Sequence, residues 1–525
     1  MDGFTPWPPE FAARYEAEGH WGRDLLGDVP GGAPGRTALV AGDTRLTYAE
    51  LDLRVRRAAD GLTALGLRRG DRVIVQLPNS AGFAVVFLAL VRSGIVPVLA
   101  LPAHRAGEIR ELCALTDARG YFMSETDGDF DVRRLARSLP VDHVVVDGDA
   151  GEFTTLADVE AAGRADSVPE RPEPGDVAVL LLSGGTTGSP KLIPRTHRDY
   201  VYNLRASAEV CGFGRDTVYL AALPAAHNFA LACPGILGAL HRGGTVVMVP
   251  TTSPAETFPL IERERVTVSA LVPPAALLWA RAAARTRHDL ASLRLVQVGG
   301  ARLAPEHAAT VPRALGCALQ QVFGMAEGLL NFTRPDDPPH LVEGTQGRPL
   351  SPADEICVVD PGGAPVPPGE VGELLTRGPY TLRGYYRAPE HNARAFTPDG
   401  FFRTGDLVRR LPSGHLVVEG RTKEQINRGG EKFAAAELEG HLLAHPAVRD
   451  AAVVGLPDPV LGERTCAFLV PRDGTPPPAL AAIKEFLRGR GVAAFKFPDR
   501  IEAVGSFPLT GVGKVDKNGL AARLR

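Results

Sequence analysis

The chain has 525 residues, several times the size of a single hydrophobic core, so we expect more than one domain. Hydrophobic residues make up 44% of it, charged residues make up 23%, and the formal net charge is −3. This composition favours a globular protein with a small-molecule partner, and it gives no electrostatic reason to expect nucleic acid or a membrane surface.

Cysteine spacing and the first residues bear on the cellular compartment. The cysteines include no C-x-x-C pair, which excludes the usual zinc spacings and provides no disulfide framework. The opening segment MDGFTPWPPEF is acidic and interrupted by proline, where a signal peptide would be basic and then apolar. The most apolar run, FAVVFLALV, stops at Arg92 and is too short to span a membrane. We therefore expect a cytoplasmic protein, as a monomer or a homodimer.

The first predicted elements are a hairpin and a helix. The segment ALVAGDTRLTY turns at Gly42 and Asp43 between two strand-like runs, which is typical of a β-hairpin. Thr47 and Glu50 follow with the spacing of a capping box, which predicts that a helix begins there. The apolar residues of this helix fall on one face: Leu51, Val55, Ala58, Leu62 and Leu65.

Further strands and helices alternate along the chain, as is typical of an α/β protein. Short apolar runs predict buried strands at residues 71–78, 176–183, 245–250 and 292–300. The last three end in small or polar residues, where an open α/β sheet places its ligand loops. Short strands and turns dominate residues 371–386, and a helix-and-strand pattern follows Gly420, which suggests a smaller C-terminal domain.

One loop is rich in small hydrogen-bond donors. The segment LLSGGTTGSPKLIPRTH, residues 181–197, combines glycines and hydroxyl side chains with Lys191, so it can wrap an anion such as a triphosphate. It is not the P-loop G-x-x-x-x-G-K-[ST], because Ser189 stands at the second glycine position and Pro190 precedes the lysine. Taken alone, such a loop is also compatible with an ordinary surface turn.

The segment SGGTTGSPK resembles the phosphate loop of the adenylate-forming superfamily of acyl- and aryl-CoA synthetases, peptide-synthetase adenylation domains and luciferases. Other motifs of that superfamily follow in its order, at residues 225–235, 320–334, 372–386, 402–407, 420–433 and 508–517. The resemblance covers nearly the whole chain, and the opening GFTPWPPEFAARY is similar to the start of stand-alone aryl-acid adenylating enzymes of siderophore biosynthesis. It implies a large domain of doubly wound sheets with a small β-barrel-like part, residues 1–420, and a smaller, mobile α+β lid domain, residues 421–525.

The resemblance also implies a reaction in two steps. ATP transfers AMP to a carboxylate with release of pyrophosphate, and a thiol then displaces AMP from the mixed anhydride. Two anions meet in the first step, so positive charge must lie between them. By resemblance that charge belongs to Lys514, with His227 as a second catalytic residue and Glu327 as the ligand of Mg²⁺. The hinge of the rotating C-terminal domain falls on Lys423.

The resemblance assigns further residues to ATP. Asp406 and Arg421 match residues that hold the ribose hydroxyls, and a carboxylate is a suitable acceptor for a diol. The full set implied for ATP is Ser183, Gly184, Gly185, Thr186, Thr187, Lys191, Gly299, Gly300, Ala301, Gln321, Val322, Phe323, Gly324, Asp406 and Arg421.

The acid is expected to be a 2-hydroxybenzoate. Relatives that activate amino acids carry an aspartate for the substrate ammonium where this chain has Asn228, which can instead hydrogen-bond an ortho hydroxyl. The implied acid-binding residues are His227, Asn228, Phe229, Cys233, Gly300 and Leu330.

Two of these positions favour salicylate over 2,3-dihydroxybenzoate. Catechol-type relatives carry a serine at Cys233 and a valine at Leu330; a thiol hydrogen-bonds a 3-hydroxyl weakly, and leucine narrows the same corner. Cys233 is otherwise an ordinary small core residue.

Three functions stay open. The first is a salicyl-AMP ligase that loads the phosphopantetheine thiol of an aryl carrier protein. The second is a CoA ligase for salicylate or 2,3-dihydroxybenzoate. The third is a nucleotide-binding protein without catalysis, which the presence of Lys514, Glu327, Asp406 and Arg421 disfavours.

Overall fold

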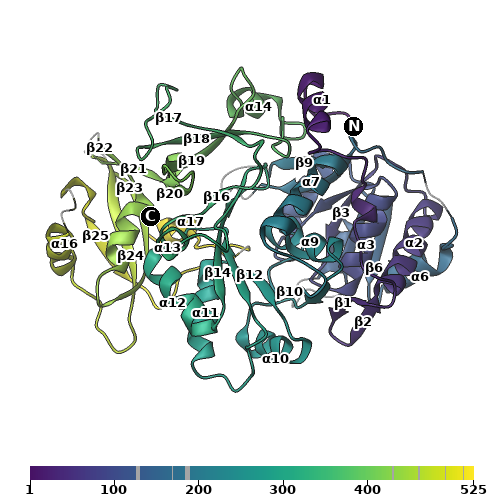
Figure 1. The fold of residues 1–525 in the computed structure, drawn as a ribbon, viewed down its shortest axis with the longest axis horizontal. Helices are drawn as coiled ribbons and strands as arrows, with labels where there is room; N and C mark the ends of the chain where they lie inside the picture. Colours follow the sequence, from purple (N-terminus) through teal and green to yellow (C-terminus); the bar gives the residue numbers. More distant parts are fainter. Residues whose placement is uncertain are drawn as a thin grey trace.

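The computed structural model describes residues 1–125, 131–167, 170–183, 190–428, 431–458, 461–490, 492, 494–511 and 513–524. Two large sheets with their helices form the right and central parts of the molecule in Figure 1, an antiparallel sheet lies above them, and a smaller unit lies on the left. The fold is therefore α/β with a smaller C-terminal part, as the sequence predicts.

The central sheet has nine strands. Its core is parallel from β14 to β1, and β2, β15 and β16 are antiparallel to their neighbours. In spatial order the strands are β16 (Arg348–Pro349), β15 (Leu330–Phe332), β14 (Ala318–Gly324), β13 (Leu295–Gly299), β12 (Val268–Leu271), β10 (Val218–Ala221), β11 (Thr245–Met248), β1 (Thr37–Ala41) and β2 (Thr44–Thr47).

The second large sheet has seven strands, parallel except for the last, which runs antiparallel to its neighbour. Its spatial order is β7 (Thr154–Thr155), β6 (His143–Asp147), β5 (Gly120–Ser124), β3 (Arg72–Gln76), β4 (Val96–Leu99), β8 (Val177–Leu182) and β9 (Leu192–Thr196).

Helices cover both sheets and fill the space between them. They are α1 (Pro9–Ala17), α2 (Tyr48–Ala64), α3 (Ala81–Arg92), α4 (Ala106–Thr116), α5 (Val132–Arg137), α6 (Leu156–Ala162), α7 (His197–Val210), α8 (Asn228–Ala232), α9 (Gly235–His241), α10 (Pro254–Glu264), α11 (Pro273–Ala283), α12 (Pro305–Leu315) and α13 (Pro339–Gly344), with a 3₁₀ turn η1 (Leu26–Asp28).

The two large sheets share one hydrophobic core. Val73 of β3 and Val296 of β13 belong to the same buried cluster, as does Leu88 of α3. The apolar run that ends at Arg92 is thus a buried core helix, with Ser80 capping its first turn by accepting from the Phe83 N–H. Among the described residues, no helix has the length and apolar character needed to cross a bilayer.

A four-stranded antiparallel sheet follows in the chain, where the sequence predicts short strands and turns and the family resemblance implies a small β-barrel-like part. Its order is β17 (Glu355–Val359), β18 (Val371–Arg377), β19 (Phe402–Arg410) and β20 (Leu416–Arg421), with α14 (Pro389–Ala395) between β18 and β19.

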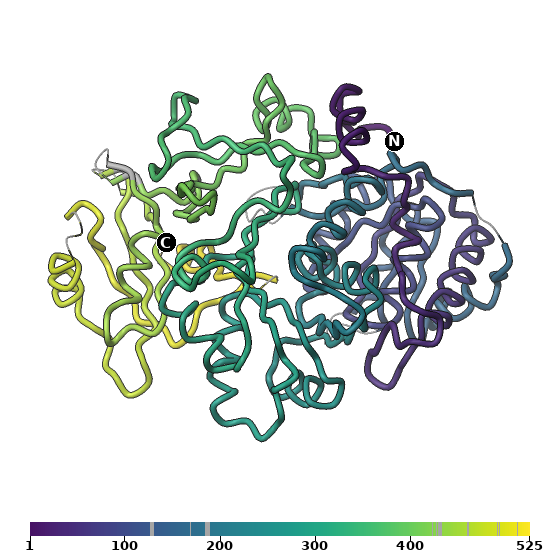
Figure 2. Tube along the Cα trace, in the orientation of Figure 1, coloured from purple at the N-terminus to yellow at the C-terminus, as the bar shows by residue number. Residues whose placement is uncertain are grey.

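The C-terminal part has its own mixed sheet and its own buried clusters. Its strands are β22 (Glu431–Ala434), β21 (Gln425–Arg428), β24 (Gly462–Pro471) and β23 (Val448–Asp458), with β25 (Arg500–Ala503) parallel to β24. Its helices are α15 (Ala435–Leu443), α16 (Leu480–Gly489) and α17 (Lys517–Ala522), with 3₁₀ turns η2 (Thr422–Glu424) and η3 (Ala494–Lys496). Figure 2 shows its yellow C-terminal segment reaching toward the middle of the molecule.

Local sequence rules account for the first elements. The hairpin turns at Gly42 and Asp43, and helix α2 begins after Thr47 with both hydrogen bonds of the predicted capping box. The Glu50 N–H donates to Thr47 Oγ1 at 3.2 Å, and the Thr47 N–H donates to Glu50 Oε2 at 2.8 Å. The other predicted strands correspond to β3, β8, β11 and β13.

Helices α2 and α6 pack so closely that a glycine is required between them. A methyl group on Gly61 would overlap the backbone carbonyl of Val159. We expect Gly61→Ala to destabilise the protein by roughly 1–3 kcal/mol through overpacking, and to lower its Tm by several degrees. Gly107→Ala in α4 is the matched control, because no neighbouring atom lies within 4 Å of its added methyl group. Equal melting temperatures for the two variants would contradict this account of the α2–α6 contact.

Candidate active site

Glycines at the carboxyl ends of β13 and β14 make room for two apolar side chains. A methyl group on Gly299 would lie 3.2 Å from two ring carbons of Phe229, so this ring lies directly against the strand backbone. Gly324 is the register partner of Leu330, and a methyl group there would overlap the leucine side chain. Ligand loops gather at this edge of a parallel sheet, so the fold places both side chains where a ligand can be bound.

His227 caps helix α8 and is uncharged. Its Nδ1 accepts a hydrogen bond of 3.2 Å from the Phe229 N–H, so the neutral ring carries its proton on Nε2. Burial, together with the positive charge of Lys514, lowers the pKa of His227 to about 4. The ring is therefore a neutral hydrogen-bond donor near pH 7 and can offer Nε2–H to an anionic oxygen.

The structure brings Asn228 and Cys233 together. Asn228 Nδ2 donates to Cys233 Sγ at 3.3 Å, and Asn228 Oδ1 accepts from the Tyr200 hydroxyl at 2.7 Å. All three side chains are buried. The amide of Asn228 is thus held from two sides by protein groups.

Lys514 reaches the same edge of the sheet from the C-terminal part of the chain. Its Cε lies 3.5 Å from the position that a Cβ atom on Gly300 would take, and Gly300 adopts a left-handed φ of +80° that suits glycine. The Lys514 loop is closed by a hydrogen bond of 2.7 Å from the Thr510 N–H to the Lys514 carbonyl. Burial lowers the pKa of Lys514, as does the charge of Arg421.

Asp406 and Arg421 are register partners on β19 and β20, and Arg421 Nε lies 3.0 Å from Asp406 Oδ1. Burial raises the pKa of Asp406 to about 6, an effect that the positive charges of Arg421 and Lys514 partly oppose. Asp406 is therefore largely ionised at pH 7 and can accept hydrogen bonds.

Glu327 is held by a neighbouring phenol. The Tyr385 hydroxyl donates to Glu327 Oε1 at 2.8 Å, and Lys191 Nζ lies 5.7 Å from the centroid of the same ring. Burial raises the pKa of Tyr385, with the Glu327 carboxylate as the next cause, so the phenol stays protonated as a donor. Across the described residues, no three His, Cys, Asp or Glu side chains cluster as metal ligands. A single carboxylate fits Mg²⁺, which commonly takes one or two protein carboxylates and completes its shell with phosphate and water oxygens.

Comparison with known proteins identifies the family of the chain. The AMP-binding enzyme family matches residues 28–386, and the AMP-binding enzyme C-terminal domain matches residues 437–514. The chain belongs to the AMP-binding enzyme family. Glu327 and Lys514 fall within the two matched regions of this adenylate-forming enzyme, and Asp406 and Arg421 lie in the stretch between them.

Two curated relatives and one solved structure are similar along nearly their whole length. The 2,3-dihydroxybenzoate-AMP ligase of Bacillus subtilis is 54% identical, over 99% of this chain and 97% of its own. The salicyl-AMP ligase / salicyl-S-ArCP synthetase of Mycobacterium tuberculosis is 51% identical, over 100% and 95%. The apo structure of MbtA from Mycobacterium smegmatis is 52% identical, over 99% of both chains, with a TM-score of 0.77.

Several predicted residues of this AMP-binding enzyme cannot be placed. Gly184, Gly185, Thr186 and Thr187 lie outside the described residues. The two ends of their loop are joined by a hydrogen bond of 3.0 Å from the Ser183 N–H to the Lys191 carbonyl.

The residues predicted to surround the nucleotide, 299–301 and 321–324, lie at the ends of β13 and β14. The side chain of Gln321 faces the protein, because its Nε2 donates to the Val342 carbonyl at 2.7 Å and its Oε1 accepts from Gln346 at 3.1 Å. Val322 is buried and Ala301 is exposed. The predicted hinge Lys423 lies in the 3₁₀ turn η2, directly after β20. The roles given to Gln321, Val322, Phe323, Ala301 and Lys423 stay predictions.

Sequence reasoning missed the groups that hold the predicted residues in place. Tyr200 orients the Asn228 amide, and Tyr385 orients Glu327. Arg195 is also buried, with its Nε 2.7 Å from Asp199 Oδ1 and its Nη1 donating to the Ala326 carbonyl at 3.1 Å. The capping-box spacing of Thr196 and Asp199 was available in the sequence, but a buried tyrosine on a helix carries no local signal of its partner.

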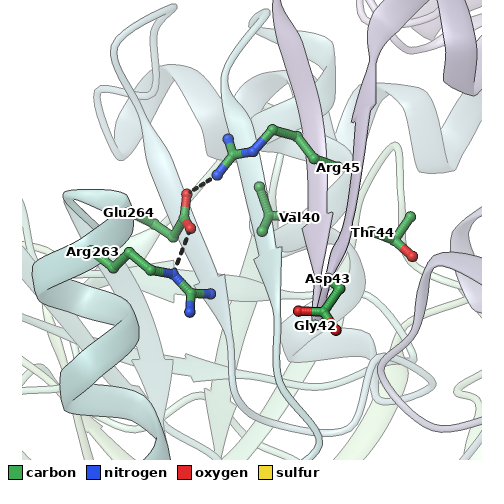
Figure 3. Close-up of a pocket in the computed structure, with 7 residues that line it drawn as sticks. All are labelled: Val40, Gly42, Asp43, Thr44, Arg45, Arg263 and Glu264. Atoms are coloured by element: carbon green, nitrogen blue, oxygen red, sulfur yellow. Dashed lines mark hydrogen bonds and ion pairs between the residues drawn. The ribbon is translucent and has the colours of Figure 1, made fainter.

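A separate surface hollow of about 290 Å³ lies at the hairpin end of the central sheet. Figure 3 shows Arg45 and Arg263 both bonded to Glu264 there, at 2.6 and 2.9 Å. Four strands separate β2 from β13 in the sheet order, and none of the predicted site residues lines this hollow. We assign it no role in the active site.

The positive charge of Lys514 should have a measurable effect on the pKa of His227. Lys514→Met is expected to raise the pKa of His227 above its value of about 4 without restoring 6.5, because burial, the larger cause, is unchanged. An NMR titration of the histidine ring signals, with the His227 signal assigned by His227→Gln, measures the shift. Lys484→Met in α16 removes a lysine that does not act on His227 and is the control. An unchanged pKa in Lys514→Met would show that the lysine lies elsewhere in solution.

Proposed function

We propose that this AMP-binding enzyme activates salicylate with ATP and transfers the salicyl group to the phosphopantetheine thiol of an aryl carrier protein. The observation that carries the proposal is the position of Lys514 at Gly300, near neutral His227, next to Gly299, against which the ring of Phe229 packs. The names of its relatives, which refer to 2,3-dihydroxybenzoate and salicylate, support an aryl acid as the substrate.

ATP binding is assigned to the antiparallel sheet and the glycine-rich loop. The ionised Asp406 carboxylate accepts hydrogen bonds from the ribose hydroxyls, and Arg421 fixes its orientation. Lys191 and the glycine-rich segment of residues 183–191 are assigned to the phosphates by their residue types. Mg²⁺, held by Glu327, would supply charge neutralisation for the polyphosphate, and the phenol of Tyr385 keeps the carboxylate in place.

Adenylate formation joins two anions. A carboxylate oxygen of the acid attacks the α-phosphorus, the bond to the bridging oxygen breaks, and pyrophosphate leaves with that electron pair. Lys514 lies between the two oxyanions and stabilises the charge that develops in the transition state. His227 donates Nε2–H to the carboxylate and remains neutral, so no proton needs to move in this step.

Thioester formation requires the lysine loop to move. The thiol sulfur, with loss of its proton, attacks the acyl carbon, and AMP leaves with the bonding electrons. Gly511 and Gly513 of the lysine loop lie against Ala103 and Val272 of the large domain and crowd this edge of the sheet. Rotation of residues 421–525 about Lys423, in the turn after β20, would withdraw the loop and admit the thiol.

Acid-dependent exchange of labelled pyrophosphate into ATP tests the proposed function. A panel of benzoates with and without an ortho hydroxyl should give exchange with salicylate. Mass measurement of the thioester with CoA or a holo-carrier protein then identifies the thiol. Exchange with none of the acids would refute the proposal, and transfer to CoA alone would make the protein a CoA ligase.

Lys514 is expected to act on the first step only. Lys514→Ala should abolish pyrophosphate exchange, while ATP binding and thioester formation from added salicyl-AMP remain close to wild type. Lys484→Ala is the control for loss of a lysine in the same domain. Equal loss of both half-reactions in Lys514→Ala would contradict the assigned role.

Cys233 and Leu330 are expected to set the preference for salicylate. A 3-hydroxyl placed at Cys233 exchanges water for a weak thiol partner that already accepts from Asn228. The cost is about 1–3 kcal/mol, so salicylate should be favoured roughly 10- to 100-fold in kcat/KM. The double variant Cys233→Ser with Leu330→Val should reduce that ratio, measured by pyrophosphate exchange with both acids. A wild type that prefers 2,3-dihydroxybenzoate, or a double variant with an unchanged ratio, would show that Cys233 and Leu330 do not set the preference between the two acids.

A further inference from the structure

Tyr200 lies one layer behind the acid pocket and is held firmly. Its ring is fully buried in α7, and the guanidinium carbon of Arg195 lies 4.7 Å from the ring centroid. Arg195 is fixed in turn by its 2.7 Å ion pair with buried Asp199. The Tyr200 hydroxyl therefore has a defined position, from which it donates to Asn228 Oδ1 at 2.7 Å.

This hydrogen bond decides which way the Asn228 amide faces. If the amide were turned over, Nδ2 would face the phenol and Oδ1 would face the thiol of Cys233, which is a weak donor. Within the described part of the chain, Asn228 Oδ1 is the acceptor that the Tyr200 hydroxyl has, so the turned amide would leave a buried O–H without a partner. A buried donor without an acceptor is costly, and the observed orientation is favoured.

The fixed amide offers a donor to a ligand. Asn228 Nδ2 carries two hydrogens, of which one points to Cys233 Sγ at 3.3 Å. The second hydrogen can be offered to a substrate atom, whereas Oδ1 is directed toward the Tyr200 hydroxyl. The pocket therefore presents N–H at the Asn228 position.

A donor at this position distinguishes two ortho substituents of benzoate. In salicylate the phenolic O–H donates to its own carboxylate, so the phenolic oxygen is exposed as an acceptor. In anthranilate one N–H of the ortho amine donates to the carboxylate, and the other N–H points outward as a donor. Two donors then face each other, which leaves both unsatisfied.

We propose that Tyr200 is a positioning residue that fixes the Asn228 amide as a donor and thereby selects ortho-hydroxy over ortho-amino benzoates. The inference rests on the proposed function, since it assumes that an aryl acid occupies the pocket beside Asn228. Tyr200 does not touch the acid, and its effect passes through the Asn228 amide alone.

The test compares salicylate and anthranilate by pyrophosphate exchange. Wild type should favour salicylate at least tenfold in kcat/KM. In Tyr200→Phe the amide is free to turn, so this ratio should fall at least fivefold, through the KM of the acid, while the KM of ATP stays unchanged. A wild type without preference overturns the proposal before any variant is made.

Two further variants complete the design. Tyr202→Phe removes a buried hydroxyl from the same helix, where it bonds to Ser351 Oγ at 2.6 Å, and should leave the ratio unchanged. Asn228→Asp still accepts from Tyr200 but presents only acceptors to the pocket, so it should shift the preference toward anthranilate.

The outcomes separate the two proposals. Exchange with no 2-hydroxybenzoate refutes the proposed function and this inference together. Exchange with salicylate, but an unchanged ratio in Tyr200→Phe, refutes the inference alone. If Tyr200→Phe does not fold, the Asn228→Asp variant provides the test. An unchanged ratio of salicylate to anthranilate in that variant would refute the claim that the Asn228 N–H selects the ortho substituent.

Discussion

The active site depends on one cation that is carried to the sheet from far along the chain. Lys514 lies against Gly300 at the end of β13, and its approach is possible because the glycine has no side chain to displace. The lysine loop rests on Val272, directly after β12, and on Ala103, in the turn after β4, so it contacts the ends of strands from both large sheets. The arrangement of these two sheets around their common core therefore sets where the positive charge lies. Burial is the main cause of the low pKa of His227, and the charge of Lys514 lowers it further. At Asp406 burial raises the pKa, and the charges of Arg421 and then Lys514 oppose that rise.

The two carboxylates of the site, Asp406 and Glu327, are each paired with a group that restricts them. Arg421 lies beside Asp406 on the neighbouring strand, and Tyr385 donates to Glu327. Such pairing lets charge gather at one edge of the sheet without leaving a buried ion alone. The same edge carries apolar side chains, Phe229 and Leu330, that rest on glycine backbone. Apolar and charged groups thus lie at the same edge of the sheet, as the proposed binding of an aromatic acid and ATP requires.

Local rules explain what the sequence could predict of this fold. The capping box of Thr47 and Glu50 and the hairpin at Gly42 involve residues close in the chain, so their geometry follows from spacing. The gathering of Lys514, Asp406 and Glu327 was available only through resemblance, because residues separated by long stretches of chain carry no mutual pattern. Gln321 illustrates the remaining difficulty, since its motif predicts a nucleotide wall while its side chain bonds to α13 and Gln346. Tyr200 was missed for a different reason. In the sequence, a buried aromatic residue on a helix looks like any other core residue, and only the structure shows the partner of its hydroxyl.

Arg195 has a consequence for how this enzyme can diverge. Its guanidinium lies over the ring of Tyr200 on one side and donates to the Ala326 carbonyl, next to Glu327, on the other. A single buried ion pair, Arg195–Asp199, thus braces both Tyr200, which bonds to Asn228, and the segment that carries Glu327. Cys233 directly follows α8 and Leu330 is the first residue of β15, and neither side chain is a member of the Arg195–Asp199 ion pair. If these two positions set the acid preference, as proposed, that preference can change by one substitution at a time, whereas a change in the Arg195–Asp199 pair would disturb Tyr200 and the segment of Glu327 together.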